Sequence, residues 1–286
     1  MTDPVLVLGG DALIGRALAD WLPRQGHAVI KTTRRPAVPS PTVLHLDLTA
    51  DVSGWRVPPA CRVAIICFGI TNLEQCRREP ERTRHINVEQ TAIVARALVA
   101  AGCFVIYLSS NHVFDGSQPW PGPGTPVSPM TEYGRQKVEA ESRLLELGDQ
   151  MAVVRMTKIF PPSPPLIQAW MRSLKAGQAI NPYDDYRCAP VSVEFAVNGI
   201  TAVAARRQAG IWHISGSEDI TYAEIARFAA HRQRYDPALV LPISARSNPG
   251  LEHLPAYSTL DASRLRDELG LSAPDVRKTL EQILQP

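Results

Sequence analysis

A tyrosine and a lysine four positions apart, Tyr133 and Lys137, are the residues of this chain best suited to proton transfer. On a helix, residues four apart share a face, so the phenol and the ammonium would point the same way. The positive charge would stabilise a phenolate and lower the tyrosine pKa, as general acid–base chemistry requires. The spacing alone is common by chance, but here it opens the helix that follows the fifth predicted strand.

A serine ends that fifth strand. Residues 103–108 form a buried apolar run, and the sequence continues Ser109-Ser110-Asn111-His112. Ligands of parallel sheets bind at the carboxyl ends of the strands, where Ser110 could hydrogen-bond a substrate carbonyl while Tyr133 delivers a proton. With hydride from a nicotinamide, these residues would form a site for carbonyl reduction.

A glycine-rich turn, Gly9 to Gly15, joins the first predicted strand to the first helix. Backbone N–H groups and the positive helix end at such a turn hold a pyrophosphate. Strand two is followed by Arg34 and Arg35, whose guanidinium groups suit a 2′-phosphate and favour NADP(H) over NAD(H). Asp47 could accept from the adenine amino group. For the Gly9–Gly15 turn, a plain strand–helix connection remains the alternative. For Arg34 and Arg35, the alternative is a solvated basic loop.

The elements that must position these residues alternate in type. Short β-branched or apolar runs predict strands, and longer amphipathic segments predict helices. Strands alternating with helices predict an α/β fold, a doubly wound parallel Rossmann sheet with helices on both faces. The strands are expected at 4–8, 27–33, 42–46, 62–67, 103–108 and 151–156, and the helices at 13–25, 74–101 and 129–147.

The regular alternation of predicted strands and helices ends near residue 160, where proline-rich loops begin. We therefore expect an NADP-binding Rossmann domain over 1–160. Residues 161–286 would form mostly a smaller substrate-binding lobe, with segments at about 193–215 returning to the Rossmann sheet.

Composition excludes several classes of protein. The 286 residues carry a net charge of +2, which argues against binding nucleic acid or an anionic membrane. No apolar stretch is long enough to span a membrane, and the N-terminal residues lack the pattern of a signal peptide. The five cysteines and seven histidines show no zinc or disulfide pattern. We therefore expect a cytoplasmic protein without a dedicated metal site.

The chain resembles the extended short-chain dehydrogenase/reductases, and within them the dTDP-4-dehydrorhamnose reductase family of sugar-nucleotide reductases. The resemblance runs nearly end to end and rests on these segments: Gly9–Gly15, Ile86–Val88, Ser109–Gly116, Tyr133–Lys137, Arg187–Val191, Gly210–Gly216 and Leu260–Leu265. It implies NADPH-dependent reduction of a nucleotide-linked 4-keto-6-deoxy sugar. Ser110 would orient the carbonyl, Tyr133 would donate the proton, and Lys137 would tune the tyrosine and hold the nicotinamide ribose.

The expected binding residues follow from these patterns and the resemblance together. For the cofactor they are Gly9, Asp11, Ala12, Leu13, Ile14, Gly15, Arg34, Arg35, Asp47, Leu48, Phe68, Gly69, Asn87, Tyr133 and Lys137. For the substrate they are Ser110, Asn111, His112, Arg155 and Arg187. The two arginines would meet a substrate diphosphate, although a surface charge or an internal ion pair is the alternative for each.

Some residues depart from the family pattern. Ala12 replaces the middle glycine of the fingerprint and adds a methyl group near the pyrophosphate. Asn111 and His112 replace the acidic pair of the related dehydratases, so dehydration is disfavoured. A sugar-nucleotide 4-epimerase and a catalytically silent regulatory subunit remain alternative functions. The resemblance also suggests a homodimer formed through the fourth and fifth helices.

Overall fold

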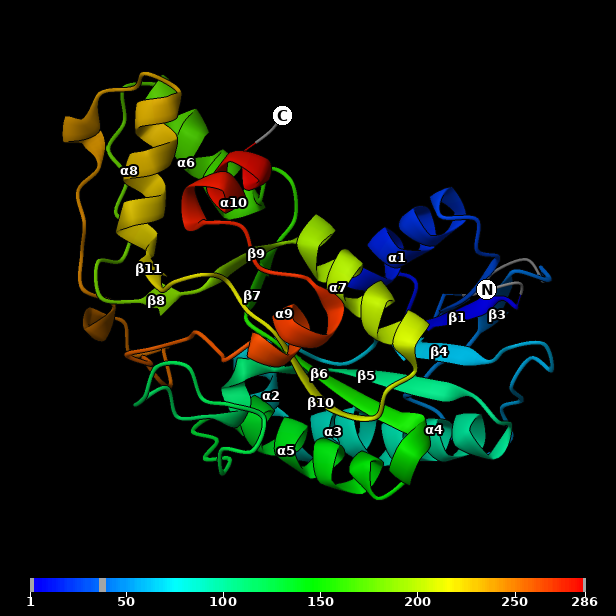
Figure 1. Cartoon of the computed structure of the whole chain (residues 1–286). Coiled ribbons are helices and arrows are strands. Elements are labelled where there is room, and N and C mark those ends of the chain that lie inside the picture. The colour runs from blue at the N-terminus through cyan, green and yellow to red at the C-terminus, as the bar shows by residue number, and fades with distance from the viewer. Residues whose placement is uncertain (1–2, 36–39, 285–286) are drawn as a thin grey trace.

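A seven-stranded sheet in which all neighbouring strands are parallel forms the centre of the protein (Figure 1). The structure, a computed structural model, describes residues 3–35 and 40–284. The strand order is β10-β6-β5-β4-β1-β2-β3, so the order reverses between β1 and β4. The strands span Val5–Leu8 (β1), Val29–Thr33 (β2), Val43–His45 (β3), Val63–Ile66 (β4), Phe104–Ser110 (β5), Met151–Met156 (β6) and Gly210–Ile214 (β10). The doubly wound parallel fold expected from the sequence is confirmed.

The central strands are apolar along their whole length because both faces of the sheet are covered. In β1 alternate residues enter two separate cores: Val5 and Val7 face one side, and Leu6 and Leu8 face the other. The first side is covered by α1 (Leu13–Arg24), α7 (Val193–Arg206) and α9 (Ser263–Leu269). The second side is covered by α4 (Thr91–Ala100) and α5 (Glu132–Leu145) (Figure 1).

The long helix predicted over 74–101 is broken in the structure. It consists of α2 (Leu73–Arg78), α3 (Pro80–Arg84), a π-helical segment (His85–Gln90) and α4. Pro80 ends the first piece because it has no N–H to donate, and it starts α3 at the position that proline favours. The π-helical segment carries Asn87 on its buried side, and such bulges are frequent at functional sites.

A smaller lobe stands beside the carboxyl ends of the strands and has its own core (Figure 1). Trp170, Ile225 and Leu280 bring three helices together in that core. The helices are α6 (Pro165–Lys175), α8 (Tyr222–Arg232) and α10 (Val276–Ile283). Two small sheets support them: β7 (Lys158–Phe160) with β9 (Pro190–Ser192), and β8 (Arg187–Cys188) with β11 (Ile220–Thr221). Between these lobe elements the chain returns to the large sheet as α7 and β10.

Among the described residues, short 3-10 helices lie at Asn111–Val113, Gly148–Gln150, Pro237–Leu239 and Ala245–Ser247. Among the helices of the described residues, none has the length and apolarity needed to cross a membrane.

Candidate active site

Two adjoining cavities lie where the strand order reverses. The larger has a volume of about 570 Å³ and the smaller about 400 Å³. They share Ala12, Phe68, Gly69 and Thr71, so one elongated ligand could occupy both. The larger cavity extends from the sheet to residues of the small lobe, including Tyr186, Arg187 and Tyr222. This is the position at which ligands bind in open α/β sheets.

The structure brings Ser110, Tyr133 and Lys137 together in the wall of the larger cavity. Helix α5 begins at Glu132, and its N-cap Thr131 accepts a hydrogen bond from the N–H of Gly134. A β-carbon on Gly134 would lie 2.2 Å from the carbonyl oxygen of His112. Glycine there therefore allows the helix to approach the loop after β5, which places Tyr133 beside Ser110.

Burial dominates the electrostatics of these three residues. It raises the pKa of Tyr133, and hydrogen bonding with Ser110 only partly opposes this. The lowered tyrosine pKa expected from the sequence is therefore wrong for the protein without a ligand. Burial also lowers the pKa of Lys137, to about 8. The Lys137 ammonium lies 5.7 Å from the Tyr133 ring centroid, and it donates to Tyr107 Oη (3.0 Å) and to the carbonyl oxygen of Leu108 (2.8 Å).

Asn111 and His112 also line the larger cavity. The His112 ring packs edge-on against Tyr133 with centroids 5.7 Å apart. Burial lowers the pKa of His112 to about 4, so the imidazole is neutral at neutral pH. Asn111 Nδ2 donates to the Oγ and the carbonyl oxygen of Ser258, which connects the β5 loop to the C-terminal part of the chain.

The glycine-rich turn is as tight as a dinucleotide site requires. Gly9 has a φ of +86°, and a β-carbon on Gly15 would lie 2.1 Å from the carbonyl oxygen of Gly9. Helix α1 begins at Leu13 with Ala12 as its N-cap, and no side chain caps this end. The first N–H groups of the helix therefore remain available to a phosphate. Ala12, Leu13 and Ile14 line the larger cavity.

The smaller cavity is lined by most of the residues expected to hold the adenosine half of a dinucleotide. Gly9, Asp11, Arg34, Asp47 and Leu48 all belong to its wall. Thr33 Oγ1 donates to Asp11 Oδ2 at 2.6 Å, so the end of β2 is fixed against the turn. The backbone and side chain of Thr49 donate to Asp47 and hold the pKa of its carboxyl group below the usual value. Exposed Arg35 and buried Gly15 lie outside both walls.

The prediction for Arg155 is wrong. This residue was a candidate for contact with the substrate, but it lines neither cavity. Its guanidinium is buried against Glu141, with 2.7 Å between Arg155 Nη2 and Glu141 Oε2 and both side chains less than 5% exposed. Ser109 Oγ donates to the same carboxylate at 2.5 Å. Arg155 therefore joins β6 to α5 from the inside, whereas Arg187 does line the larger cavity.

Asn87 also lies outside both walls. Its side chain bonds the backbone of Ile70, which lines the smaller cavity. Asn87 therefore contacts the loop that follows β4 and lies outside the cavity walls.

Several residues of the site had no clear signal in the sequence. Lys158 and His253 line the larger cavity, and Arg82 lines the smaller one. Lys158 follows β6 closely, so its place at the carboxyl end of a strand was the one available clue. Among the described residues that line the larger cavity, Lys137, Lys158 and Arg187 are cationic and none is Asp or Glu. This wall suits an anionic ligand, whereas the described residues contain no cluster of three or more potential metal ligands.

Comparisons with known proteins cover nearly the whole chain. A family model described as "RmlD substrate binding domain" matches residues 2–286. The dTDP-4-dehydrorhamnose reductase of Streptomyces griseus is 30% identical over 271 residues, which are 91% of this chain and 86% of the relative. The methionine adenosyltransferase 2 subunit beta of Bos taurus is 26% identical, over 93% of this chain and 82% of that protein.

A solved structure with the same fold is that of the dTDP-4-dehydrorhamnose reductase of Bacillus anthracis in complex with NADP. It superimposes with a TM-score of 0.85 and 21% identity, and it covers 99% of both chains.

Proposed function

The chain belongs to the dTDP-4-dehydrorhamnose reductase family, and from this premise we propose that it reduces the keto group of a nucleotide-linked 4-keto-6-deoxy sugar with NADPH. It is an NADP-dependent oxidoreductase of the short-chain dehydrogenase/reductase type. The observation that carries the proposal is the wall of the larger cavity, where Ser110, Tyr133 and Lys137 lie with two further cationic side chains, Lys158 and Arg187, and no Asp or Glu among the described lining residues.

The residues present fit a dinucleotide. The smaller cavity offers Asp47 and Leu48 for an adenine and Arg34 for a 2′-phosphate. The uncapped N-terminus of α1 lies between the cavities and would hold the pyrophosphate. When bound, NADPH supplies the hydride. Lys137 would then hold the nicotinamide ribose near Tyr133.

The protein's own residues bind the substrate and move the proton. Ser110 would hydrogen-bond the carbonyl oxygen, and the Tyr133 phenol would donate its proton to that oxygen as the alcohol forms. Burial raises the pKa of Tyr133, so the phenol is protonated at neutral pH and holds the proton that it would donate. Arg187 and Lys158 would bind the diphosphate of the nucleotide sugar, and Asn111 and His112 would contact the sugar.

The test is a spectrophotometric assay in which the protein is mixed with NADPH and a panel of nucleotide-linked 4-keto sugars. We expect NADPH to be consumed with one or more of them, and Tyr133→Phe to lose nearly all of this rate while still binding NADPH. A wild-type protein that oxidises no NADPH with any of these sugars would contradict the proposal.

Two alternatives give different outcomes. A 4-epimerase would convert the sugar without net consumption of NADPH. A regulatory subunit is favoured by the similarity to methionine adenosyltransferase 2 subunit beta, and it would bind a partner enzyme without turning over any keto sugar. The retained Ser110, Tyr133 and Lys137 argue against the silent subunit, and Arg34, which suits the 2′-phosphate of NADP(H), argues against an epimerase that retains NAD(H).

We also propose that the protein is a cytoplasmic homodimer. Helices α4 and α5 lie side by side on one face of the sheet, where a second copy could pack against them (Figure 1). Light scattering after size-exclusion chromatography measures the mass directly, and a monomer at micromolar concentration would contradict the dimer.

A further inference from the structure

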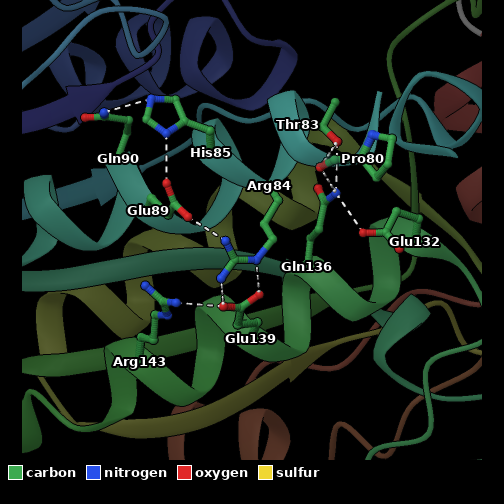
Figure 2. A network of polar contacts seen from close by, with 10 residues as sticks. All are labelled: Pro80, Thr83, Arg84, His85, Glu89, Gln90, Glu132, Gln136, Glu139 and Arg143. Atoms are coloured by element: carbon green, nitrogen blue, oxygen red, sulfur yellow. Dashed lines mark hydrogen bonds and ion pairs between the residues drawn. The ribbon is translucent and has the colours of Figure 1, made fainter. Parts of the chain in front are cut away.

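Gln136 lies between the catalytic residues Tyr133 and Lys137 in the sequence but lines neither cavity. It is 1% exposed. Its Nε2 donates to Thr83 Oγ1 (2.9 Å), to Glu132 Oε1 (3.1 Å) and to the carbonyl oxygen of Pro80 (3.3 Å) (Figure 2). A buried amide with this many partners fixes the elements that supply them, because each broken bond leaves an unsatisfied polar group.

These partners determine which way the Gln136 amide points. The Pro80 carbonyl and the Glu132 carboxylate can only accept, so the NH₂ group of Gln136 must face them. Its Oε1 then faces Asn87, whose Nδ2 donates to it at 2.8 Å. Asn87 is thereby oriented in turn, with Oδ1 directed toward the loop after β4.

The loop after β4 receives both remaining bonds of Asn87. Asn87 Oδ1 accepts from the N–H of Ile70 at 2.7 Å, and Nδ2 donates to the carbonyl oxygen of Ile70 at 2.9 Å. Gly69 precedes Ile70 with a φ of +145°, and the place of its absent β-carbon is 3.3 Å from Asn87 Oδ1. Both Gly69 and Ile70 line the smaller cavity, and Gly69 lines the larger one too.

We propose that Gln136 is a positioning residue that couples the catalytic helix to the cofactor-facing loop by fixing the orientation of the Asn87 amide. The inference rests on the proposed function, because it assigns Gln136 a part in NADPH binding. Proton transfer does not pass through Gln136. Its effect should therefore fall on the affinity for NADPH rather than on the chemical step.

The main variant is Gln136→Met, which keeps the length of the side chain and removes its amide. We expect the KM and the Kd for NADPH to rise about tenfold, because the bond to Asn87 that orients the cofactor-facing loop is lost, while kcat changes less than about threefold. Asp275→Ala is the matched control. It removes the N-cap of the distant helix α10, which lowers stability, and should leave both constants for NADPH unchanged.

A double-mutant cycle separates coupling from a merely structural role. Asn87→Ala alone should also raise the KM for NADPH, and adding Gln136→Met to it should have little further effect, since the bond between them is already absent. If Gln136→Met does not fold, Thr83→Val can replace it. This variant removes the hydroxyl that accepts from Gln136 Nε2 and should raise the KM for NADPH by a smaller factor. Additive effects in the cycle, or a wild-type KM in either Gln136→Met or Thr83→Val, would overturn the proposal.

Hydrogen exchange tests the same coupling without a cofactor. The amide of Ile70 should exchange faster in Gln136→Met than in the wild type and in Asp275→Ala. Equal exchange at Ile70 would refute the coupling. A wild-type protein that fails to bind NADPH would instead refute the proposed function, so the two failures are distinguishable.

Discussion

The ion pair between Arg155 and Glu141 gives the sharpest prediction about stability. Their side chains are 3% and 4% exposed, and Arg155 Nε and Nη2 both donate to the Glu141 carboxylate. Glu141→Gln removes the negative charge and leaves the guanidinium buried without compensation. Breaking a buried pair in this way typically costs about 3–5 kcal/mol. We expect a loss of this size in the free energy of unfolding measured by urea denaturation.

Glu139 provides a matched control on the same helix. It also accepts from two arginines, Arg84 and Arg143, but its side chain is 33% exposed (Figure 2). Glu139→Gln should therefore cost less than about 1 kcal/mol, because water screens an exposed pair. Equal losses of unfolding free energy in the two variants would refute this reasoning. They would show that burial does not determine how much the Arg155–Glu141 pair contributes to stability.

Three further predictions concern pH and cofactor choice. Arg34→Gln should raise the KM for NADPH about ten- to a hundredfold, the loss expected for charge-assisted bonds to a phosphate, and leave the KM for NADH unchanged in steady-state kinetics. Because burial lowers the pKa of Lys137 to about 8, kcat/KM for NADPH should fall as pH rises through about 8. Lys137→Arg should remove this limb of the pH profile, since a guanidinium stays charged. Burial lowers the pKa of His213 to about 4, so the unfolded state binds the extra proton between about pH 4 and 6.5 and stability must fall as pH drops through that window. Urea denaturation from pH 6.5 to 5 should show a shallower fall for His213→Gln, and an unchanged slope would contradict this assignment.

The fold could be predicted because the pattern of apolar residues along the sequence indicates which faces of each strand and helix are buried. A run such as Val5–Leu8, buried on both faces, has few alternatives to a central parallel strand. Ser110 and Tyr133 could be placed in one cavity for a second reason. The carboxyl end of β5 and the start of the next helix must lie close together. Pro80 breaks the helix that was predicted over residues 74–101, and no local pattern in the sequence indicates the π-helical segment that follows α3.

The contacts that could not be predicted join residues distant in sequence. Arg155 was a candidate substrate ligand because a basic residue near a strand end can face the cavity. It faces Glu141 instead, and only the packing of α5 on β6 determines this. The raised pKa of Tyr133 likewise depends on its burial in the folded chain, which outweighs any local effect of spacing. Helical spacing correctly places Lys137 on the inner face of α5, but its bonds to Tyr107 and Leu108 come from another element.

The central claim is that the phenol of Tyr133 and a bound nicotinamide act on the same carbonyl group. NADPH carrying deuterium at the reactive nicotinamide carbon tests it most directly, with mass spectrometry and NMR of the sugar product. We expect one deuterium on the carbon that bore the keto group, and almost no labelled product with Tyr133→Phe. Product without deuterium, or labelled product formed equally fast by Tyr133→Phe, would contradict it.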